Sequence, residues 1–257
     1  MDLGFIKLPL YGLCIVTGIL SGGALARLLC IRLNKNIYDF IIISAVITAF
    51  AFLFAKLLYL LTAFPLSSFF KVVWLMLRHP VKSGLVESGF VFYGGLLGGL
   101  VGYLVGTKIA RVAFSDFLNI FAFVIPYIHA WGRVGCFCAG CCYGIPYEGL
   151  LAVHYSHPVS DVPCGPGIFP VQLVEALLLF AFAFSIFPFI LKNRQAPFFL
   201  IYLLFYSVVR FALEYLRYDE GRGFIGSLSV SQWISTFVFI ISLAILMLNL
   251  LQGVKKK

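Results

Sequence analysis

Charged residues are scarce in this chain of 257 residues: they make up 11% of it, and only 10 of them are acidic. Soluble domains carry about 25% charged residues, so the composition excludes an ordinary water-soluble fold. The hydrophobic share of 62% points the same way. Histidines number only 4, and no pattern matches a catalytic triad or a phosphate-binding loop. We therefore predict an integral membrane protein.

Long apolar runs provide the first structural prediction, because a helix needs about 20 such residues to cross a bilayer. They predict an all-α polytopic membrane protein with about seven transmembrane helices, near 8–30, 40–62, 90–110, 115–135, 170–191, 197–216 and 230–251. The first run is too long for a cleaved signal peptide. We expect residues 1–257 to form a single transmembrane domain.

The net charge of +9 is distributed unevenly along the chain. Lysine and arginine gather beside alternate loops and at the C-terminus, whereas the 136–169 loop has neither. The positive-inside rule then predicts an outer N-terminus, a cytoplasmic C-terminus and an extracytoplasmic 136–169 loop. Aromatic and basic residues in the 63–89 segment favour an interfacial amphipathic helix. The basic charge would serve topology and anionic lipids, and we expect no nucleic-acid partner.

Four glycines recur at every fourth position of the third predicted helix: Gly94, Gly98, Gly102 and Gly106. Such a smooth stripe lets two helices approach closely in a membrane, and tight packing is the interpretation we favour. Alternatively, the Gly94-Gly95 pair keeps its backbone open to a ligand.

Ionisable side chains within the predicted helices are few, and each is costly at membrane depth. An arginine such as Arg133 costs about 2.5–3.5 kcal/mol there unless an anion meets it. Arg133 and Arg217 both lie near the outer ends of predicted helices. They either extend to the headgroups or share an anionic ligand, and we favour a lipid phosphate because arginine binds phosphate through two parallel hydrogen bonds.

Other polar residues share helix faces through their spacing. His129 is one turn from Arg133, so it is either an acid–base group or a hydrogen-bonded packing residue. Arg210, Glu214 and Arg217 would follow one face, with Arg210 and Glu214 forming an ion pair. Gln172 and Glu175 open the fifth predicted helix three residues apart.

Cysteines cluster at the start of the 136–169 loop. The cluster comprises Cys136, Cys138, Cys141 and Cys142, and Cys164 follows later in the loop. An extracytoplasmic loop permits disulfides, and pairing of Cys164 with one of the cluster is the simplest arrangement. Cys138 and Cys141 also have the C-x-x-C spacing of redox and zinc sites, which His154 or His157 could complete. We favour a disulfide over a metal site; packing or a reactive thiol stays open.

Several motifs run through nearly the whole chain. They are Y-G-L at 11–13, F-Y-G-G-L at 92–96, G-R-V-G-C-F at 132–137, F-P-V-Q-L-V-E at 169–175, the Y…R…E…R series at 206–217 and S-Q at 231–232. Together they resemble the motifs of prolipoprotein diacylglyceryl transferases. The resemblance implies a transferase of the bacterial plasma membrane, without a cofactor. It would move a diacylglyceryl group from phosphatidylglycerol to the cysteine thiol of a lipoprotein precursor and release glycerol phosphate.

The resemblance also implies residue roles. Arg133 and Arg217 would clamp the phosphate, and Tyr93 stands where the family has a histidine of its motif. To these catalytic residues we add His129, because it lies one turn from Arg133. The substrate-binding residues would be Tyr11, Gly94, Gly95, Gln172, Glu175, Arg210 and Glu214.

Some positions depart from the family pattern: Tyr93 and Phe169 replace histidines, Cys136 an asparagine and Cys141 a glutamate. Tyrosine, with a pKa near 10, is a poor base at neutral pH. Either His129 replaces it, or the chemistry is altered. The alternatives are therefore a phospholipid-dependent transferase with another acceptor and a non-catalytic lipid-binding or maturation partner.

Overall fold

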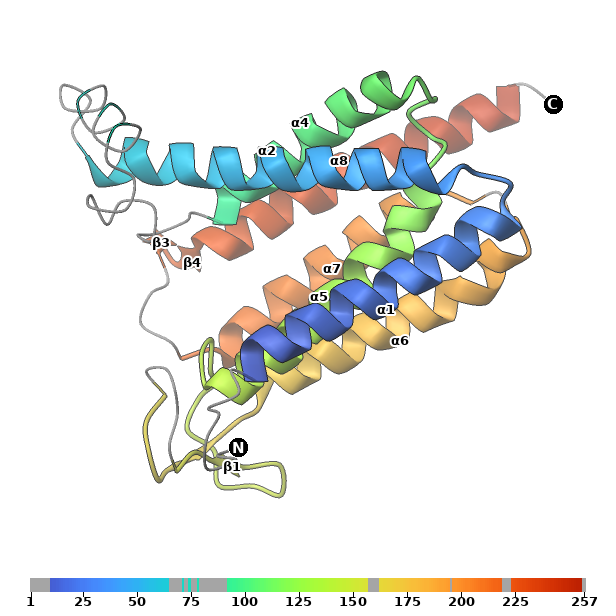
Figure 1. The fold of residues 1–257 in the computed structure, drawn as a ribbon. Coiled ribbons are helices and arrows are strands. Elements are labelled where there is room, and N and C mark those ends of the chain that lie inside the picture. Colours follow the sequence, from blue (N-terminus) through green and yellow to red (C-terminus); the bar gives the residue numbers. More distant parts are fainter. Residues whose placement is uncertain are drawn as a thin grey trace, which may run out of the picture. The chain divides into compact units, whose positions relative to one another are not determined.

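The computed structural model describes residues 10–64, 71, 74, 78, 92–156, 162–194, 196–218 and 223–255, and these are mostly helical (Figure 1). The long helices are α1 (Leu10–Arg32), α2 (Ile37–Ala63), α4 (Phe92–Ala110), α5 (Leu118–Ala139), α6 (Val171–Leu191), α7 (Phe198–Leu213) and α8 (Val230–Lys255). A 3-10 turn, η1 (Glu214–Leu216), follows α7. Two short antiparallel pairs join β1 (Val153–His154) to β2 (Gly167–Ile168) and β3 (Phe224–Ile225) to β4 (Leu228–Ser229).

These seven helices correspond to the seven predicted spans, with ends that differ by a few residues. Six of the described helices are long and apolar enough to cross a membrane, and α4, counted over Gly94–Ala110, is shorter. The all-α polytopic membrane architecture is therefore confirmed. Most of the predicted interfacial segment near 63–89 lies outside the described residues.

Helix α5 is longer than the sequence predicted. Its end was expected near residue 135, but it continues to Ala139, so Cys136 and Cys138 lie in its last turn and not in the following loop. Two residues apart on a helix means about 200° apart around its axis. The side chains of Cys136 and Cys138 therefore point in nearly opposite directions.

Local packing explains why the glycines of α5 do not end the helix. A Cβ added at Gly135 would lie 3.1 Å from the Tyr11 ring on α1, so a small residue permits this close helix contact. The helix ends instead at Gly140, whose φ of +76° is left-handed. The Gly140 N–H donates to the Cys136 carbonyl at 3.0 Å, as is usual for a glycine that closes a helix.

The chain divides into two compact units, residues 35–117 and residues 1–34 with 118–257. That both belong to a single domain stays a prediction. In the 35–117 unit the glycine stripe of α4 faces α2. An added Cβ would come within 2.3 Å of the Phe54 carbonyl oxygen at Gly94 and within 2.2 Å of the Phe50 oxygen at Gly98. The tight-packing interpretation of the stripe is confirmed.

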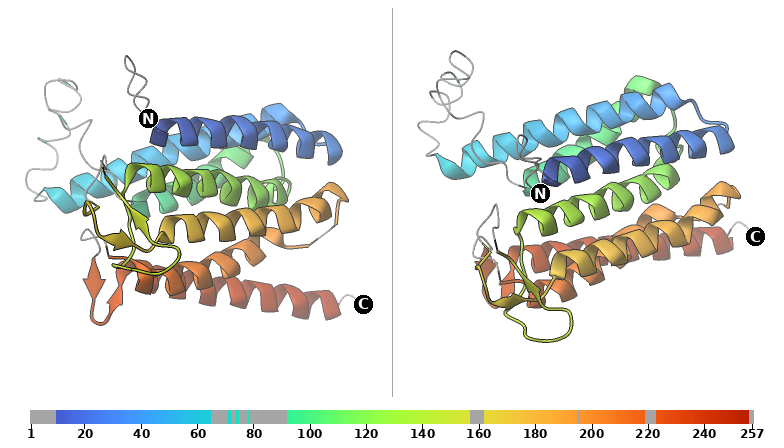
Figure 2. Two further views of the ribbon diagram at one scale, coloured as in Figure 1. Left: turned by 90° about the horizontal axis from the view of Figure 1, so that it is seen from below. Right: turned by 60° about the horizontal axis from the view of Figure 1, so that its bottom comes forward.

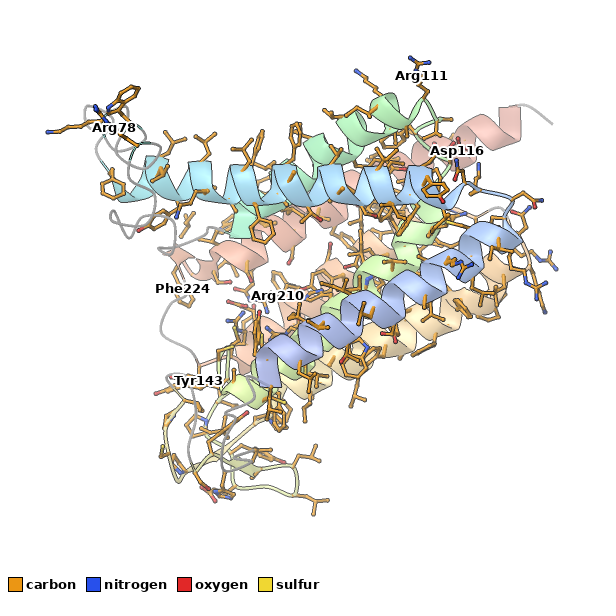
Figure 3. All side chains as sticks on the ribbon, in the orientation of Figure 1. Arg78, Arg111, Asp116, Tyr143, Arg210 and Phe224 are labelled. Carbon is orange, nitrogen blue, oxygen red and sulfur yellow. The ribbon has the colours of Figure 1, made fainter. Side chains whose placement is uncertain are left out.

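An ion pair joins the two ends of the 35–117 unit. Lys35 Nζ lies 2.5 Å from Asp116 Oδ1, and the other Asp116 oxygen accepts a hydrogen bond from the Ala113 N–H at 2.9 Å (Figure 3). The hydrogen bond from Lys35 lowers the pKa of Asp116, so the carboxylate stays charged at neutral pH.

In the larger unit α5 contacts α1, α6 and α7, and α7 packs in turn against α8 (Figure 2). Aromatic rings fill the space around α5. Phe123 and Tyr127 of α5 meet Phe180 and Phe184 of α6 at centroid distances between 5.6 and 6.3 Å. These contacts are in the range that stabilises aromatic pairs, so α5 and α6 are held in a defined register.

The connection between α5 and α6 holds the segment that follows α7. Gly144 forms a β-bridge with Arg217, and the Ile145 N–H donates to the Leu216 carbonyl at 3.0 Å. The backbone on either side of Arg217 is therefore held by the connection that follows α5.

Candidate active site

Charged side chains from α5, α6, α7 and the turn after α7 meet in one buried network. Arg133 Nη2 lies 2.9 Å from Glu175 Oε2, and Arg210 Nη1 lies 3.8 Å from the same oxygen. Arg210 Nη2 is 2.8 Å from Glu214 Oε2 (Figure 3). Arg217 Nη1 lies 3.9 Å from that Glu214 oxygen. The signs of these five side chains alternate from Arg133 to Arg217; we call them the charge network.

Within the described residues, positive charges outnumber negative ones in the charge network. Its three arginines and two glutamates leave a net charge of +1. Glu175 is 1% exposed and Arg133 is 7% exposed, so water screens this charge poorly. An excess buried charge is unfavourable unless a counterion meets it. The network is therefore suited to bind one anionic group.

Arg133 still has hydrogen-bonding capacity in this network. Among the described residues its Nε has no hydrogen-bond partner, and its Nη2 is close to Glu175 without being aligned for a hydrogen bond. Buried donors without partners are rare in folded proteins. Arg133 is thus buried and ion-paired, unlike a side chain that extends to the headgroups, and it has donors left for a further acceptor.

Neutral polar groups complete the surroundings of the two carboxylates. The Tyr206 hydroxyl donates to Glu175 Oε1 at 2.9 Å, and His129 Nε2 lies 3.8 Å from that oxygen. The His129 ring meets the Tyr206 ring at 5.2 Å. Ser231, in the first turn of α8, donates to Glu214 Oε2 at 3.0 Å. Tyr206 and Ser231 were not among the predicted site residues, although both lie in the motifs that would have indicated them.

The predicted position of Arg217 on a helix was wrong. The sequence placed it on the same helix face as Arg210 and Glu214. Helix α7 ends at Leu213, Glu214 lies in η1, and Arg217 has extended backbone with φ −90° and ψ 148°. The predicted ion pair of Arg210 and Glu214 is confirmed. Arg217 still approaches Glu214 because a 3-10 turn brings residues i and i+3 onto one side.

Gln172 supports the turn after α5. It is fully buried, and its Nε2 donates to the Cys141 carbonyl at 2.9 Å. Tyr11 on α1 is 46% exposed and interacts electrostatically with Arg133 and Cys142. A direct role of Gln172 or Tyr11 in substrate binding stays a prediction.

Tyr93, Gly94 and Gly95 belong to the 35–117 unit, and the side chain of Tyr93 lies outside the described residues. Gly94 is packed against α2 as described above. The roles predicted for these residues in catalysis and substrate binding stay predictions.

Three of the five cysteines between residues 136 and 164 come together. The sulfur atoms of Cys136, Cys141 and Cys142, here called the thiol cluster, all lie within 4.8 Å of one another. Cys138 instead interacts with Cys14 on α1. The C-x-x-C pair Cys138–Cys141 is therefore not brought together.

The remaining cysteine of the loop, Cys164, is exposed, and all seven cysteines are free thiols. His154, which the sequence offered as a zinc ligand, contacts the Gly165 carbonyl through Nδ1 at 2.8 Å, and His157 lies outside the described residues. The thiol cluster is adjacent to the charge network. Hydrogen bonds from Cys136 and Cys141, and then Arg217 and Arg133, hold the pKa of Cys142 below its ordinary value.

Comparison with known proteins identifies the family. A model of the prolipoprotein diacylglyceryl transferase family matches residues 1–248. The chain belongs to this family. Its relatives in the family include the phosphatidylglycerol–prolipoprotein diacylglyceryl transferase 2 of Clostridium perfringens (strain 13 / Type A), 31% identical over 174 residues, or 66% of each chain. The transferase of Clostridium tetani (strain Massachusetts / E88) is 32% identical over 160 residues, 61% of this chain and 62% of that protein.

A longer alignment joins the chain to the transferase of Dehalococcoides mccartyi (strain ATCC BAA-2266 / KCTC 15142 / 195). The two are 26% identical over 226 residues, which is 85% of this chain and 81% of that protein. With the two clostridial relatives the chain aligns over slightly less than two thirds of their length. The diacylglyceryl transferase family model spans every residue of the charge network.

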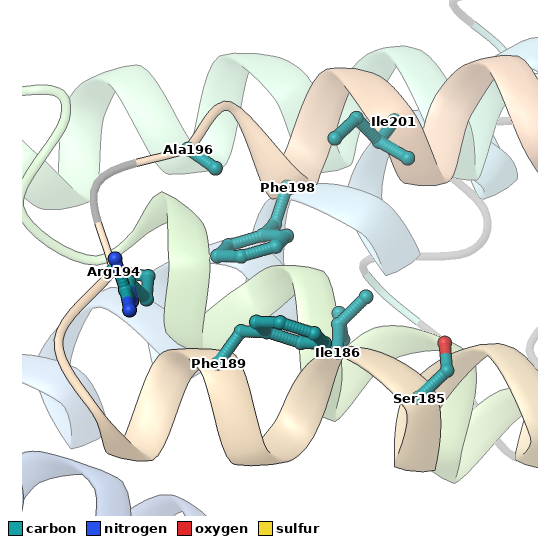
Figure 4. A pocket seen from close by; sticks show the side chains of 7 residues that line it. All are labelled: Ser185, Ile186, Phe189, Arg194, Ala196, Phe198 and Ile201. Atoms are coloured by element: carbon teal, nitrogen blue, oxygen red, sulfur yellow. The ribbon is translucent and has the colours of Figure 1, made fainter.

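A shallow hollow elsewhere on the larger unit is separate from the charge network. It lies near the other end of α6, where this helix meets the start of α7 (Figure 4). Its lining residues are Ser185, Ile186, Phe189, Arg194, Ala196, Phe198 and Ile201. The charge network and the thiol cluster lie elsewhere in the described residues, where α5 ends and α6 begins.

Proposed function

We propose that this protein transfers a diacylglyceryl group from phosphatidylglycerol to the cysteine thiol of a prolipoprotein and releases glycerol phosphate. It acts in the bacterial plasma membrane, with its N-terminus outside and its C-terminus in the cytoplasm. The names of its relatives support the reaction. The observation that carries the proposal is the charge network, whose two arginine ends, Arg133 and Arg217, suit one phosphate.

The phosphate gains negative charge during this reaction, and a network with arginines at its ends can stabilise that charge. The acceptor sulfur forms a bond to the glycerol carbon of the diacylglyceryl group, and the bond between that carbon and the phosphate oxygen breaks. The electron pair stays on the oxygen, so a phosphodiester with one negative charge becomes a monoester that approaches two. Arg133 and Arg217, which we call the phosphate clamp, interact more strongly with the second state than with the first. Differential stabilisation of this kind accelerates the step.

A base must take the proton of the acceptor thiol, because the thiolate is the nucleophile. His129 is suited to this role. Its Nε2 lies 3.8 Å from Glu175, and the Glu175 carboxylate can stabilise the imidazolium that forms. His129 lies one turn before Arg133 on α5, so the base and one arginine of the phosphate clamp share a helix.

The distribution of basic residues supports the orientation. Arg32 lies in the last turn of α1, Lys192 follows α6, and Lys255 is the last residue of α8. These three helix ends lie on the same side of the larger unit (Figure 2). Arg133 and Glu175 lie toward its opposite end, which would face the outer leaflet.

The test is an assay of the purified protein with phosphatidylglycerol vesicles and a peptide that carries a lipoprotein signal cysteine. We expect release of glycerol phosphate with equimolar peptide modification. Arg133→Ala and Arg217→Ala should each lower the rate by about 10²-fold or more, as loss of one transition-state donor does. His129→Ala should lower it as well. The matched control is Arg194→Ala, because Arg194 is an exposed arginine beyond the far end of α6.

Three results would contradict the proposal. Glycerol phosphate release without peptide modification would indicate a different acceptor. Lipid binding without turnover would indicate a non-catalytic partner. Full activity in both clamp variants would show that the charge network does not bind the reacting phosphate.

A further inference from the structure

The thiol cluster consists of three sulfur atoms that converge from one helix end and the turn after it. Cys136 lies in the last turn of α5, and Cys141 and Cys142 follow the glycine that ends the helix. The three sulfurs lie within 4.8 Å of one another, and each cysteine is partly buried. The ligands of one tetrahedral zinc ion lie about 3.8 Å apart, given a Zn–S distance of about 2.3 Å. Shifts of no more than about 1 Å would bring all three sulfurs onto one ion.

The backbone around the cluster is held in place before any ion binds. The Cys136 carbonyl accepts the N–H groups of both Gly140, at 3.0 Å, and Cys141, at 3.1 Å. The fully buried Gln172 holds the Cys141 carbonyl from α6. Cys142 has a left-handed φ of +56°, which is uncommon for a residue other than glycine and here directs its side chain back to the cluster. Such pre-organisation is what a metal site requires.

A disulfide explains this arrangement less well. A disulfide uses two sulfurs and leaves the third without a role, whereas here three sulfurs converge and none is bonded. Two neighbouring cysteines are outside the cluster: Cys138 interacts with Cys14, and Cys164 is exposed. Three convergent thiols match the ligand set of soft cations, which prefer thiolate sulfur.

Two arginines of the charge network lie next to the thiol cluster. Both Arg217 and Arg133 interact electrostatically with Cys142, and Arg133 also interacts with Cys136. Three thiolates around a divalent cation leave a net charge of −1. Because Arg217 and Arg133 interact with the cluster cysteines, their attraction lowers the cost of this negative charge.

We propose that Cys136, Cys141 and Cys142 form a three-thiolate site for a soft d¹⁰ cation such as Zn²⁺, with the fourth coordination position left to water or an added ligand. The proposal does not depend on the transfer reaction, since metal binding can be measured without lipid or peptide. Metal binding releases the protons of the three thiols to the solvent and needs no oxidant.

Binding is tested with the full-length protein, purified in detergent under reducing conditions. Cd²⁺ replaces Zn²⁺ as a spectroscopic probe, because cadmium–thiolate bonds absorb in the ultraviolet. We expect one Cd²⁺ per chain with the absorption of three thiolates, and competition by Zn²⁺. Cys136→Ser, Cys141→Ser and Cys142→Ser should each weaken binding by more than about tenfold, since even outer-shell changes cost that much. The matched controls Cys138→Ser and Cys164→Ser should bind like the unaltered protein.

A second measurement avoids the risk that a variant fails to fold. Zn²⁺ should protect the three cluster cysteines of the unaltered protein from alkylation, mapped by mass spectrometry, while Cys164 reacts with and without the ion. Absence of stoichiometric binding by the reduced protein would overturn the proposal. So would unchanged binding after all three serine substitutions, or alkylation of the cluster at the same rate with and without Zn²⁺.

Discussion

Glu175 is the residue through which most of the charge network is connected. It is 1% exposed and faces Arg133, Arg210, His129 and the Tyr206 hydroxyl. A lone buried carboxylate would be very costly, but here two guanidinium groups and one hydrogen bond compensate it. The carboxylate in turn makes two buried arginines tolerable. Its main role at the residue scale is therefore to hold opposite charges together.

Replacing Glu175 by glutamine tests this role. Glu175→Gln leaves Arg133 without its partner, and breaking a buried pair in this way costs about 3–5 kcal/mol. We expect the melting temperature in detergent to fall by roughly 10 °C. The double variant Glu175→Gln/Arg133→Gln should lose less stability than the sum of the two single variants, because no unpaired charge remains between them. Glu148→Gln, at an exposed position, serves as the control. Additive losses would show that the two residues are not coupled.

Sequence reasoning anticipated contacts within one helix better than contacts between helices. The spacing of Arg210 and Glu214 predicts their ion pair, since residues four apart on a helix are neighbours. The pairing of Arg133 with Glu175 follows no such rule, because the two residues come from different helices. Only the packing of α5 on α6 brings them together. The sequence could therefore name the five members of the charge network but not the connection between Arg133 and Glu175.

At the scale of elements, the length of α5 decides where the cysteines point. A loop beginning at residue 136 would leave Cys138 and Cys141 free to meet, as their spacing suggested. The helix continues to Ala139, so Cys138 turns toward α1 and Cys136 toward the following turn. A glycine in a helix is usually unfavourable, but at Gly135 it lets α1 approach α5 closely. This tertiary contact is not visible in the sequence.

The glycine stripe of α4 yields a prediction at the same scale. An alanine Cβ at position 98 would lie 2.2 Å from the Phe50 carbonyl oxygen, whereas at position 99 the nearest atom is Ile47 Cγ2 at 3.9 Å. Gly98→Ala should therefore separate α2 from α4 and cost about 1–3 kcal/mol. Gly99→Ala should be neutral or slightly stabilising, because alanine favours a helix over glycine. Thermal unfolding in detergent compares the two, and equal melting temperatures would contradict the packing argument.

At the scale of the whole molecule, the proposed orientation rests on helix number and charge. If all seven long helices cross the membrane, the two ends of the chain would lie on opposite sides of it. The basic residues at the ends of α1, α6 and α8 would then assign the side on which α8 ends to the cytoplasm. The α5–α6 connection, which has no lysine or arginine, would lie outside.

Reporter proteins in a bacterial host test this orientation. Alkaline phosphatase is active only outside the cytoplasm, and green fluorescent protein exported in unfolded form does not fluoresce. Phosphatase inserted at Leu150, which is fully exposed, should be active, and phosphatase fused after Lys257 should be inactive. Green fluorescent protein at the same two positions should give the reverse result. An active phosphatase at the C-terminus would contradict the orientation, and it would place the charge network at the inner leaflet, away from an acceptor thiol exported across the membrane.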